Sequence, residues 1–250
     1  MDYFNVKNLN KSFGGLVAVS KLDFEVPEGK IVGVIGPNGA GKTTLFNLIT
    51  GFINPDSGSI VWQGRDIVGS KPYQIVNVGI SRTFQLVKPF NELSLYDNLK
   101  VACYGRRFLR KHKHHHPRQI DSLLNATAEL VGLPSDLGQL ASNLGQGDLR
   151  LLDIARVLVT GPDLLLLDEP LSGLSSIETM KLVELIKKLN NEGSTILIIE
   201  HKLQELMNIA DKIVAIDFGI KITEGTPSEV VNHAGVIKSY LGDKKRYVTT

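Results

Sequence analysis

One stretch decides the fold of this 250-residue chain: Gly36-Pro37-Asn38-Gly39-Ala40-Gly41-Lys42-Thr43, with Thr44 directly behind it. The stretch follows an apolar run of β-forming residues, Ile31 to Ile35, and leads into an amphipathic run, Thr44 to Thr50. The order is a buried strand, a glycine-rich turn and a helix. The three glycines allow backbone conformations that are closed to other residues, and they let amide N–H groups approach a ligand closely.

This order and spacing predict a loop that cradles the phosphates of a nucleotide. The free N–H groups and the positive dipole end of the following helix point at the same phosphates. Lys42 supplies a mobile positive charge for the β- and γ-phosphates, and the Thr43 hydroxyl can bind Mg²⁺. The alternative is a simple strand-to-helix connector, and eight matched positions in the right context argue against it.

The bulk properties exclude several classes of protein. The formal net charge is +2, which gives no strong field for non-specific binding of nucleic acid, so no nucleic-acid partner is expected. No apolar run approaches the ~18 residues of a membrane helix, and Met1 to Phe4 does not resemble a secretory signal. Cys103 is the only cysteine, which favours a reducing compartment. We therefore expect a cytoplasmic protein with one large α/β domain.

The chain up to residue 85 reads mainly as β structure around the loop. Strands are expected at Val6–Phe13, Leu16–Val26, Ser59–Trp62 and Ile80–Phe84, with a turn at residues 54–58. Because the first two strands are separated only by a short turn, antiparallel pairing is expected before the phosphate-binding loop.

From Asn91 to about Val159 the apolar spacing is largely helical, which indicates an inserted helical subdomain. Within it, Arg106 to Pro117 is basic and rich in histidine, and we expect a solvated loop or a frayed helix end there. Its histidines are candidate metal ligands, but no acidic or cysteine partners are nearby, so an exposed basic insert is the favoured interpretation. These histidines are His112, His114, His115 and His116.

The last third of the chain alternates apolar strands with helices. Strands are expected at Asp163–Leu167, Thr195–Ile199 and Lys212–Asp217, and a helix at Ile177–Leu189. Strands without polar alternation that are separated by helices indicate a parallel sheet covered on both faces. The charged segment from residue 243 to residue 246 is expected to be a solvated tail.

Two carboxylates end the first of these strands. Asp168 stands where a phosphate-loop enzyme holds Mg²⁺, and Glu169, one residue on, can polarise a water for in-line attack on the γ-phosphate. A plain strand-ending turn before Pro170 is the alternative. The phosphate-binding loop upstream favours the catalytic interpretation.

Four features together resemble an ATP-binding-cassette (ABC) ATPase over essentially the whole chain. They are the stretch 36–43, Asp168-Glu169-Pro170, Gln85, and His201 after the strand Ile196 to Glu200. The resemblance implies an α/β P-loop NTPase with a RecA-like parallel core, an N-terminal antiparallel β subdomain and an inserted α-helical subdomain. The single domain would span residues 1–250, with 1–85 and 159–250 as the core and 86–158 as the helical subdomain.

The resemblance also implies roles for individual residues, with ATP and Mg²⁺ as cofactors. Phe13 is at the position that stacks on adenine, the alternative being an ordinary core aromatic. Gln85 resembles the residue that links the γ-phosphate and Mg²⁺ to a transmembrane partner, and His201 resembles the switch histidine that contacts the γ-phosphate. The catalytic set is thus Glu169, His201, Gln85 and Lys42, and the metal set is Thr43, Gln85 and Asp168.

The family signature, Leu-Ser-Gly-Gly-Gln, is altered here to Leu144-Gly145-Gln146-Gly147-Asp148. In the family this motif reaches across a head-to-tail dimer to the partner's γ-phosphate. Loss of a hydrogen bond to a charged group costs ~1.5–3 kcal/mol, so Gly145 would weaken the opposite site by roughly 10- to 150-fold. Gly173-Leu174-Ser175 is a second departure, where many members carry Leu-Asp. We therefore expect an asymmetric pair with a second ABC ATPase, with a homodimer as the alternative.

Several local stretches resemble the ATPase subunits of branched-chain amino-acid importers. They include residues 81–90, 98–102, 199–213, 224–227 and 236–242. The resemblance implies transmembrane permease subunits as partners, an extracytoplasmic binding protein acting indirectly, and a peripheral position on the cytoplasmic face of the membrane. Two alternatives remain open: an ATPase of lipid export, which shares Arg82-Thr83-Phe84-Gln85, and a degraded ATP-binding regulator with little hydrolysis.

Overall fold

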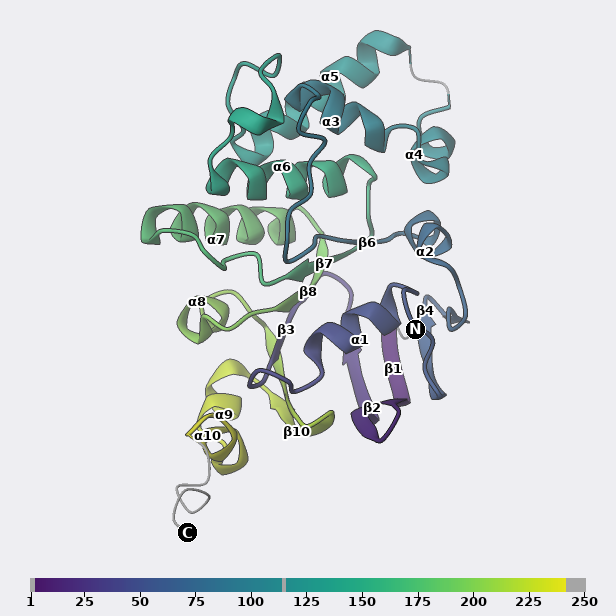
Figure 1. The fold of residues 1–250 in the computed structure, drawn as a ribbon, viewed down its shortest axis with the longest axis vertical. Coiled ribbons are helices and arrows are strands. Elements are labelled where there is room, and N and C mark those ends of the chain that lie inside the picture. The colour runs from purple at the N-terminus through teal and green to yellow at the C-terminus, as the bar shows by residue number, and fades with distance from the viewer. Residues whose placement is uncertain (1–2, 114–115, 242–250) are drawn as a thin grey trace. The chain divides into compact units, whose positions relative to one another are not determined.

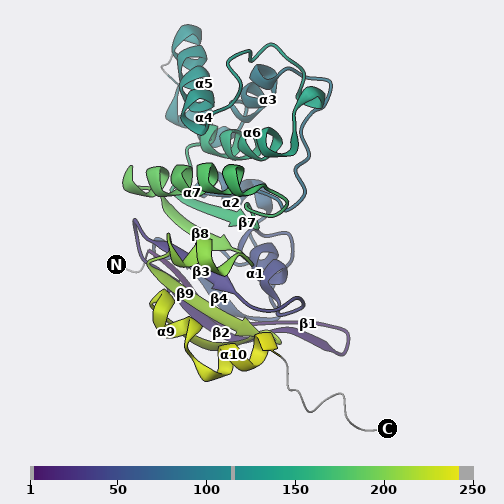
Figure 2. The same ribbon diagram turned by 90° about the vertical axis from the view of Figure 1, so that its left-hand side faces the viewer.

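The structure, a computed structural model, describes residues 3–113 and 116–241. The chain divides into two compact units. The first comprises Met1–Lys71 and Thr195–Thr250, and the second comprises Pro72–Ser194. Figures 1 and 2 give the helices and strands of both units in two orthogonal views.

An antiparallel sheet forms one layer of the first unit. Phe4 on the first strand lies opposite Val26 on one side and Trp62 on the other, and its ring centre is 6.4 Å from that of Trp62. Buried and exposed side chains alternate from Leu22 to Val26, and Phe4, Val6 and Leu9 of the first strand are also buried, so these residues form a core. The strand order is β2 (Leu16–Val26), β1 (Phe4–Phe13), β4 (Ser57–Trp62), β5 (Arg65–Asp66).

The second layer of this unit is mostly parallel, as the sequence predicts. β3 (Ile31–Ile35) pairs in parallel with β8 (Thr195–Ile199) and β9 (Lys212–Asp217), and β10 (Ile220–Gly225) returns antiparallel to β9. All five residues of β3 are buried, which explains its lack of polar alternation. The glycine-rich loop leaves the carboxyl end of β3 and enters α1 (Lys42–Ile49), visible in Figure 1.

The C-terminal elements of the first unit were not predicted. β10 is followed by α9 (Pro227–Val231) and α10 (Ala234–Leu241), which lie side by side in both views (Figures 1 and 2). α9 begins at a capping box in which Thr226 and Glu229 exchange hydrogen bonds. The short helix α8 (Leu203–Met207) follows β8 and buries Leu206.

The second unit contains one parallel strand pair and most of the helices. β6 (Ile80–Arg82) runs parallel to β7 (Leu164–Asp168), and all five residues of β7 are buried. α7 (Ser176–Asn191) begins at a capping box made by Ser175 and Glu178. The helices are α2 (Pro72–Val78), α3 (Leu95–Ala102), α4 (Arg106–Lys111), α5 (Pro117–Val131), η1 (Ala141–Asn143), α6 (Gln146–Val159) and α7 (Ser176–Asn191).

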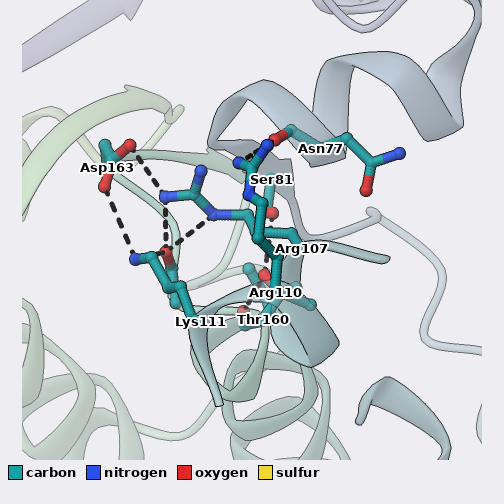
Figure 3. Close-up of polar contacts among 9 residues, drawn as sticks. Asn77, Ser81, Arg107, Arg110, Lys111, Thr160 and Asp163 are labelled. Carbon is teal, nitrogen blue, oxygen red and sulfur yellow. Dashed lines mark hydrogen bonds and ion pairs between the residues drawn. The ribbon is translucent and has the colours of Figure 1, made fainter. Parts of the chain in front are cut away.

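The sequence predicts a solvated loop or a frayed helix end from Arg106 to Pro117, and the structure has a partly buried helix in the first half of this segment instead. Residues 106–111 form α4, and this helix buries Arg107 and Phe108. The Arg107 guanidinium forms an ion pair of 2.7 Å with Asp163 and donates two hydrogen bonds to the carbonyl oxygen of Gly161 (Figure 3). The guanidinium of Arg107 can be buried in this helix because the Asp163 carboxylate and the Gly161 carbonyl oxygen pair with it. His114 and His115 lie outside the described residues.

Smaller differences concern the ends of elements. Ser57 and Gly58 begin β4 rather than belonging to the preceding turn, and β6 ends at Arg82 rather than at Phe84. The charged segment 243–246 lies outside the described residues. Within residues 3–113 and 116–241, no helix combines the length and apolar character needed to cross a membrane. The assignment of residues 86–158 to a separate helical subdomain stays a prediction.

Candidate nucleotide-binding site

The glycine-rich loop packs so closely against its own unit that two glycines are required. A Cβ at Gly36 would lie 2.2 Å from the carbonyl oxygen of Ile216, and one at Gly41 would lie 2.3 Å from that of Ala18. Gly41 also has φ 99° as the N-cap of α1, and Gly39 has φ 82°. These values lie in the left-handed region that glycine adopts without strain. The loop therefore has the close-packed geometry that the sequence predicts.

The chemistry of this loop suits an anion. Lys42 is buried, and its ammonium group donates to the carbonyl oxygens of Gly36 at 2.7 Å and Pro37 at 2.9 Å. The first turn of α1 contains no acidic residue, so the positive end of the helix dipole is not neutralised there. Thr43 is exposed in that turn and Thr44 is half-buried. Of the remaining loop residues, Asn38 is exposed and Ala40 is buried.

Two further candidates belong to the same unit. The side chain of Phe13, at the end of β1, is 47% exposed, so Phe13 is not a core aromatic. The ammonium of Lys11 lies 5.4 Å from its ring centre. His201 is exposed two residues after the end of β8, and its backbone N–H donates to Glu200 Oε2 at 3.0 Å. The buried Glu200 carboxylate, which the sequence analysis did not single out, therefore helps to shape the turn at His201.

In the second unit, the two predicted carboxylates end β7. Asp168 is buried, and its Oδ2 lies 2.6 Å from Nη2 of Arg82. Its backbone N–H donates to Oγ1 of Thr83 at 3.2 Å. Glu169 is half-buried with φ 48°, an uncommon conformation for a residue with a side chain. The structure therefore places Glu169 at a sharp turn directly after the strand.

Gln85 lies beside Glu169. The Gln85 side-chain amide donates to Glu169 Oε2 at 2.9 Å, which joins two predicted catalytic residues. A side chain of α6 holds the segment that contains Gln85 through hydrogen bonds. Arg150 donates to the carbonyl oxygens of Phe84 at 2.9 Å and Gln85 at 3.1 Å.

Asp153, also on α6, completes this attachment by accepting from the backbone N–H of Phe84 at 3.2 Å. Burial raises the pKa of the Asp153 carboxyl, and the hydrogen bond from Phe84 partly opposes that shift. Sequence reasoning assigned no role to Arg150 or Asp153. Their spacing of three residues places them on one face of a helix, and this spacing was the sequence feature that could have indicated a shared role.

The altered signature lies at the start of α6, as predicted. Leu144 ends η1, Gly145 is the N-cap of α6, and Asp148 is the acidic residue of its first turn. A Cβ at Gly147 would lie 2.2 Å from Glu178 Oε1, so α7 closely approaches the signature there. A Cβ at Gly145 would meet no atom within 4 Å. The structure therefore has room for the missing serine at position 145.

The two groups of candidates belong to different units. The loop 36–44, Phe13 and His201 are in the first, and Gln85, Asp168, Glu169 and residues 144–148 are in the second. Among the described residues, no group of three or more His, Cys, Asp or Glu side chains is arranged to hold a metal ion. Two of the predicted histidines have structural contacts, since His112 stacks near Phe108 and His116 caps α5.

A phosphate-binding loop between a buried strand and a helix, with a buried strand that ends in Asp-Glu, defines an ATPase of the phosphate-loop class. The family model "ABC transporter" matches residues 19–172, and the model "Branched-chain amino acid ATP-binding cassette transporter" matches residues 221–245. The chain belongs to the ABC transporter family of ATP-binding cassettes.

Curated relatives and solved structures agree with this assignment. The chain is 42% identical over 247 residues to the high-affinity branched-chain amino acid transport ATP-binding protein LivG of Salmonella typhimurium, covering 95% of this chain and 97% of that protein. It is 38% identical over 255 residues to BraF of Pseudomonas aeruginosa, which has the same description, covering 95% and 97%.

Among solved structures, a nucleotide-free ATP-binding cassette from an ABC transporter has a TM-score of 0.87 at 28% identity, covering 97% of this chain and 100% of that one. A cassette in its ADP conformation has a TM-score of 0.85 at 30% identity, with the same coverage. The predicted fold class, the ATPase activity and the nucleotide cofactor are thereby confirmed.

Proposed function

We propose that this chain is the ATP-hydrolysing subunit of an importer of branched-chain amino acids. The observation that carries this proposal is the pair of family matches on one chain. A general cassette at residues 19–172 is followed by a C-terminal segment, residues 221–245, that matches the model specific for branched-chain amino acid cassettes. The relatives named for this transport cover nearly the whole chain, which supports the same substrate class.

In this proposal the first unit binds the nucleotide. The backbone amides of the loop and the Lys42 ammonium hold the phosphates, and the exposed ring of Phe13 stacks on adenine. Stacking on a flat apolar face suits any base, so Phe13 contributes affinity rather than base selectivity. His201 contacts the γ-phosphate from the end of β8.

The second unit supplies the groups that act on the attacking water. Glu169 accepts its proton, and Gln85 orients the Glu169 carboxylate through the 2.9 Å hydrogen bond. Thr43, Gln85 and Asp168 are oxygen donors of the kind that Mg²⁺ prefers, and these residues would hold it. When bound, Mg²⁺ would neutralise charge on the β- and γ-phosphate oxygens.

The partners follow from the family. We propose that the chain works at the cytoplasmic face of the membrane beneath two permease subunits that an extracytoplasmic binding protein feeds. The segment Gln85 to Phe90 is proposed to contact the permease, and its exposed apolar side chains support this role. They are Leu86 and Phe90, and the exposed ring of Phe84 directly precedes the segment.

The second ATPase of the complex is proposed to differ from this chain. Gly145 cannot donate the side-chain hydrogen bond of the family serine, and Asp148 would bring a negative charge towards the partner's phosphate. The site that contains this chain's own Lys42 and Glu169 is then the active one, working with the partner's signature. A homodimer is the alternative that the experiment below distinguishes.

The test is to isolate the Glu169→Gln variant from native membranes in the presence of ATP and to identify the proteins that accompany it. The proposal expects two permeases, a second ATPase and an amino-acid-binding protein. A matched control, Glu169→Gln combined with Lys42→Ala, should fail to retain ATP in the complex. Recovery of a lipid-export partner, or of no membrane protein, would overturn the importer proposal.

A further inference from the structure

A buried arginine lies against the carboxylate that is proposed to hold Mg²⁺. Arg82 is the last residue of β6, and its Nη2 lies 2.6 Å from Asp168 Oδ2. Only 5% of the Arg82 side chain and 3% of the Asp168 side chain are exposed. The ring of Phe84 covers the guanidinium, with 5.3 Å between the guanidinium carbon and the ring centre.

The backbone fixes this arrangement. β6 and β7 pair in parallel, with Arg82 opposite Leu166, and Thr83 donates from its backbone N–H to the carbonyl oxygen of Leu166 at 3.0 Å. The Thr83 hydroxyl then accepts from the backbone N–H of Asp168. Both ends of the ion pair are therefore attached to a rigid pair of strands, and the distance between them does not depend on a flexible loop.

A buried carboxylate without a cation is strongly unfavourable, because burial removes the water that stabilises its charge. In the chain without metal, Arg82 supplies the compensating charge for Asp168. A divalent cation that binds the same carboxylate must do so beside a positive charge already in contact with it. At an effective dielectric constant of about 20, like charges a few ångströms apart repel by several kcal/mol.

We propose that Arg82 is a built-in counter-ion that holds the Asp168 carboxylate when no divalent cation is bound and competes with the cation for it. Arg82 thereby keeps the metal affinity of the site low and is a positioning residue for the reaction. This inference rests on the proposed role of Asp168 in metal binding.

The same unit contains a second ion pair with a buried arginine for comparison, in which the carboxylate, Asp163, is 37% exposed. Arg107 is equally buried, with 5% of its side chain exposed, and its Nη2 lies 2.7 Å from Asp163 Oδ2 (Figure 3). Asp163 immediately precedes β7, whereas Asp168 ends it, so the two pairs lie at opposite ends of one strand. Loss of either arginine should destabilise the fold, but only loss of Arg82 should change metal binding.

The experiment titrates the purified full-length chain with Mn²⁺ in the presence of ADP and measures free Mn²⁺ by electron paramagnetic resonance. Arg82→Met should bind Mn²⁺ at least about 10-fold more tightly than the wild type, because one positive charge beside the metal is removed. Arg82→Lys keeps the charge and should return the affinity towards the wild-type value. Arg107→Met should leave it unchanged.

A second measurement keeps the inference testable if Arg82→Met folds poorly. Mn²⁺ should raise the melting temperature of ADP-bound Arg82→Gln by more than it raises that of the wild type, since the metal replaces the lost counter-ion. An equal or smaller rise with Arg82→Gln, or unchanged or weaker Mn²⁺ affinity with Arg82→Met, overturns the inference. Asp168→Asn distinguishes the counter-ion role of Arg82 from the metal-binding role of Asp168. If this variant keeps the wild-type Mn²⁺ affinity, the proposed metal-binding role of Asp168 is wrong.

Discussion

Gln85 and Glu169 are 84 positions apart in the chain, and the side-chain amide of Gln85 donates a 2.9 Å hydrogen bond to Glu169 Oε2. Glu169 also has φ 48°, a conformation that is sparsely populated for residues with side chains. A strained backbone and a side-chain hydrogen bond together hold one orientation of the carboxylate. Such restraint is typical of groups that act at a defined point in a reaction.

We predict that Glu169→Gln lowers ATP hydrolysis by about 100-fold or more, because general-base catalysis contributes at least that factor. Nucleotide binding should be retained, since the loop and Lys42 are unchanged. Phosphate release and ATP occupancy of the isolated complex are the measurements. Glu192→Gln, an exposed change at the C-cap of α7, is the control. Undiminished hydrolysis in Glu169→Gln would remove Glu169 from the mechanism.

Lys42→Ala should weaken nucleotide binding by about 10-fold or more, since a charge-assisted hydrogen bond contributes roughly 1.5–3 kcal/mol. Equilibrium binding of a fluorescent ATP analogue measures this loss. The control is Lys187→Ala, which removes an exposed lysine of α7. Equal affinity in the two variants would contradict the assignment of Lys42.

Arg150→Met should destabilise the chain by about 1–3 kcal/mol, because it leaves the carbonyl oxygens of Phe84 and Gln85 without their hydrogen-bond donor. Urea denaturation gives this difference as a shift of the midpoint. Arg118→Met, an exposed substitution in α5, should change stability by less than about 0.5 kcal/mol. A midpoint of Arg150→Met that matches the wild type would show that α6 does not hold residues 84 and 85.

Cys103 should react slowly with alkylating reagents in the native chain. It is 7% exposed at the C-cap of α3, and burial raises the pKa of its thiol from 9.0 to about 11. Because the thiolate is the nucleophile, the native rate with iodoacetamide should still be rising with pH above 9. In denaturant the rate should level off once the pH exceeds the ordinary pKa of a cysteine thiol. Identical native and denatured profiles would contradict the buried position.

Gly145→Ser tests the asymmetric pair. A Cβ at position 145 meets no atom within 4 Å, so the substitution should not perturb the fold. If this signature faces the slow site, the added hydroxyl should raise hydrolysis by the assembled complex. Gly138→Ser, in the loop before η1, is the control for an added hydroxyl. No change with Gly145→Ser, together with full activity of the chain as a homodimer, would argue for two equivalent sites.

Most of the fold was predictable because local patterns matched the final structure. β2, β8 and β9 occupy the predicted residues, since continuous apolar runs and flanking turns define them without help from distant residues. α4 was missed because charged residues fill four of its six positions, and the burial of Arg107 depends on two distant acceptors, the Asp163 carboxylate and the Gly161 carbonyl oxygen.

The principal candidate residues of the site could be predicted from the sequence. The residues that hold some of them in place could not. The phosphate-binding loop and the Asp-Glu pair are contiguous motifs that a single chain displays. Arg82 and Arg150 act through partners 86 and 66 positions away, respectively. Their roles depend on which strands and helices meet, and no local spacing encodes that.

Arg150 and Asp153 hold residues 84 and 85 through main-chain atoms, namely two carbonyl oxygens and one N–H. Every amino acid except proline presents these same atoms. The side chains from residue 86 to residue 89 can therefore diverge while this main-chain attachment stays the same. A cassette built this way can adapt to a different permease by altering its contact surface and leave its catalytic machinery untouched.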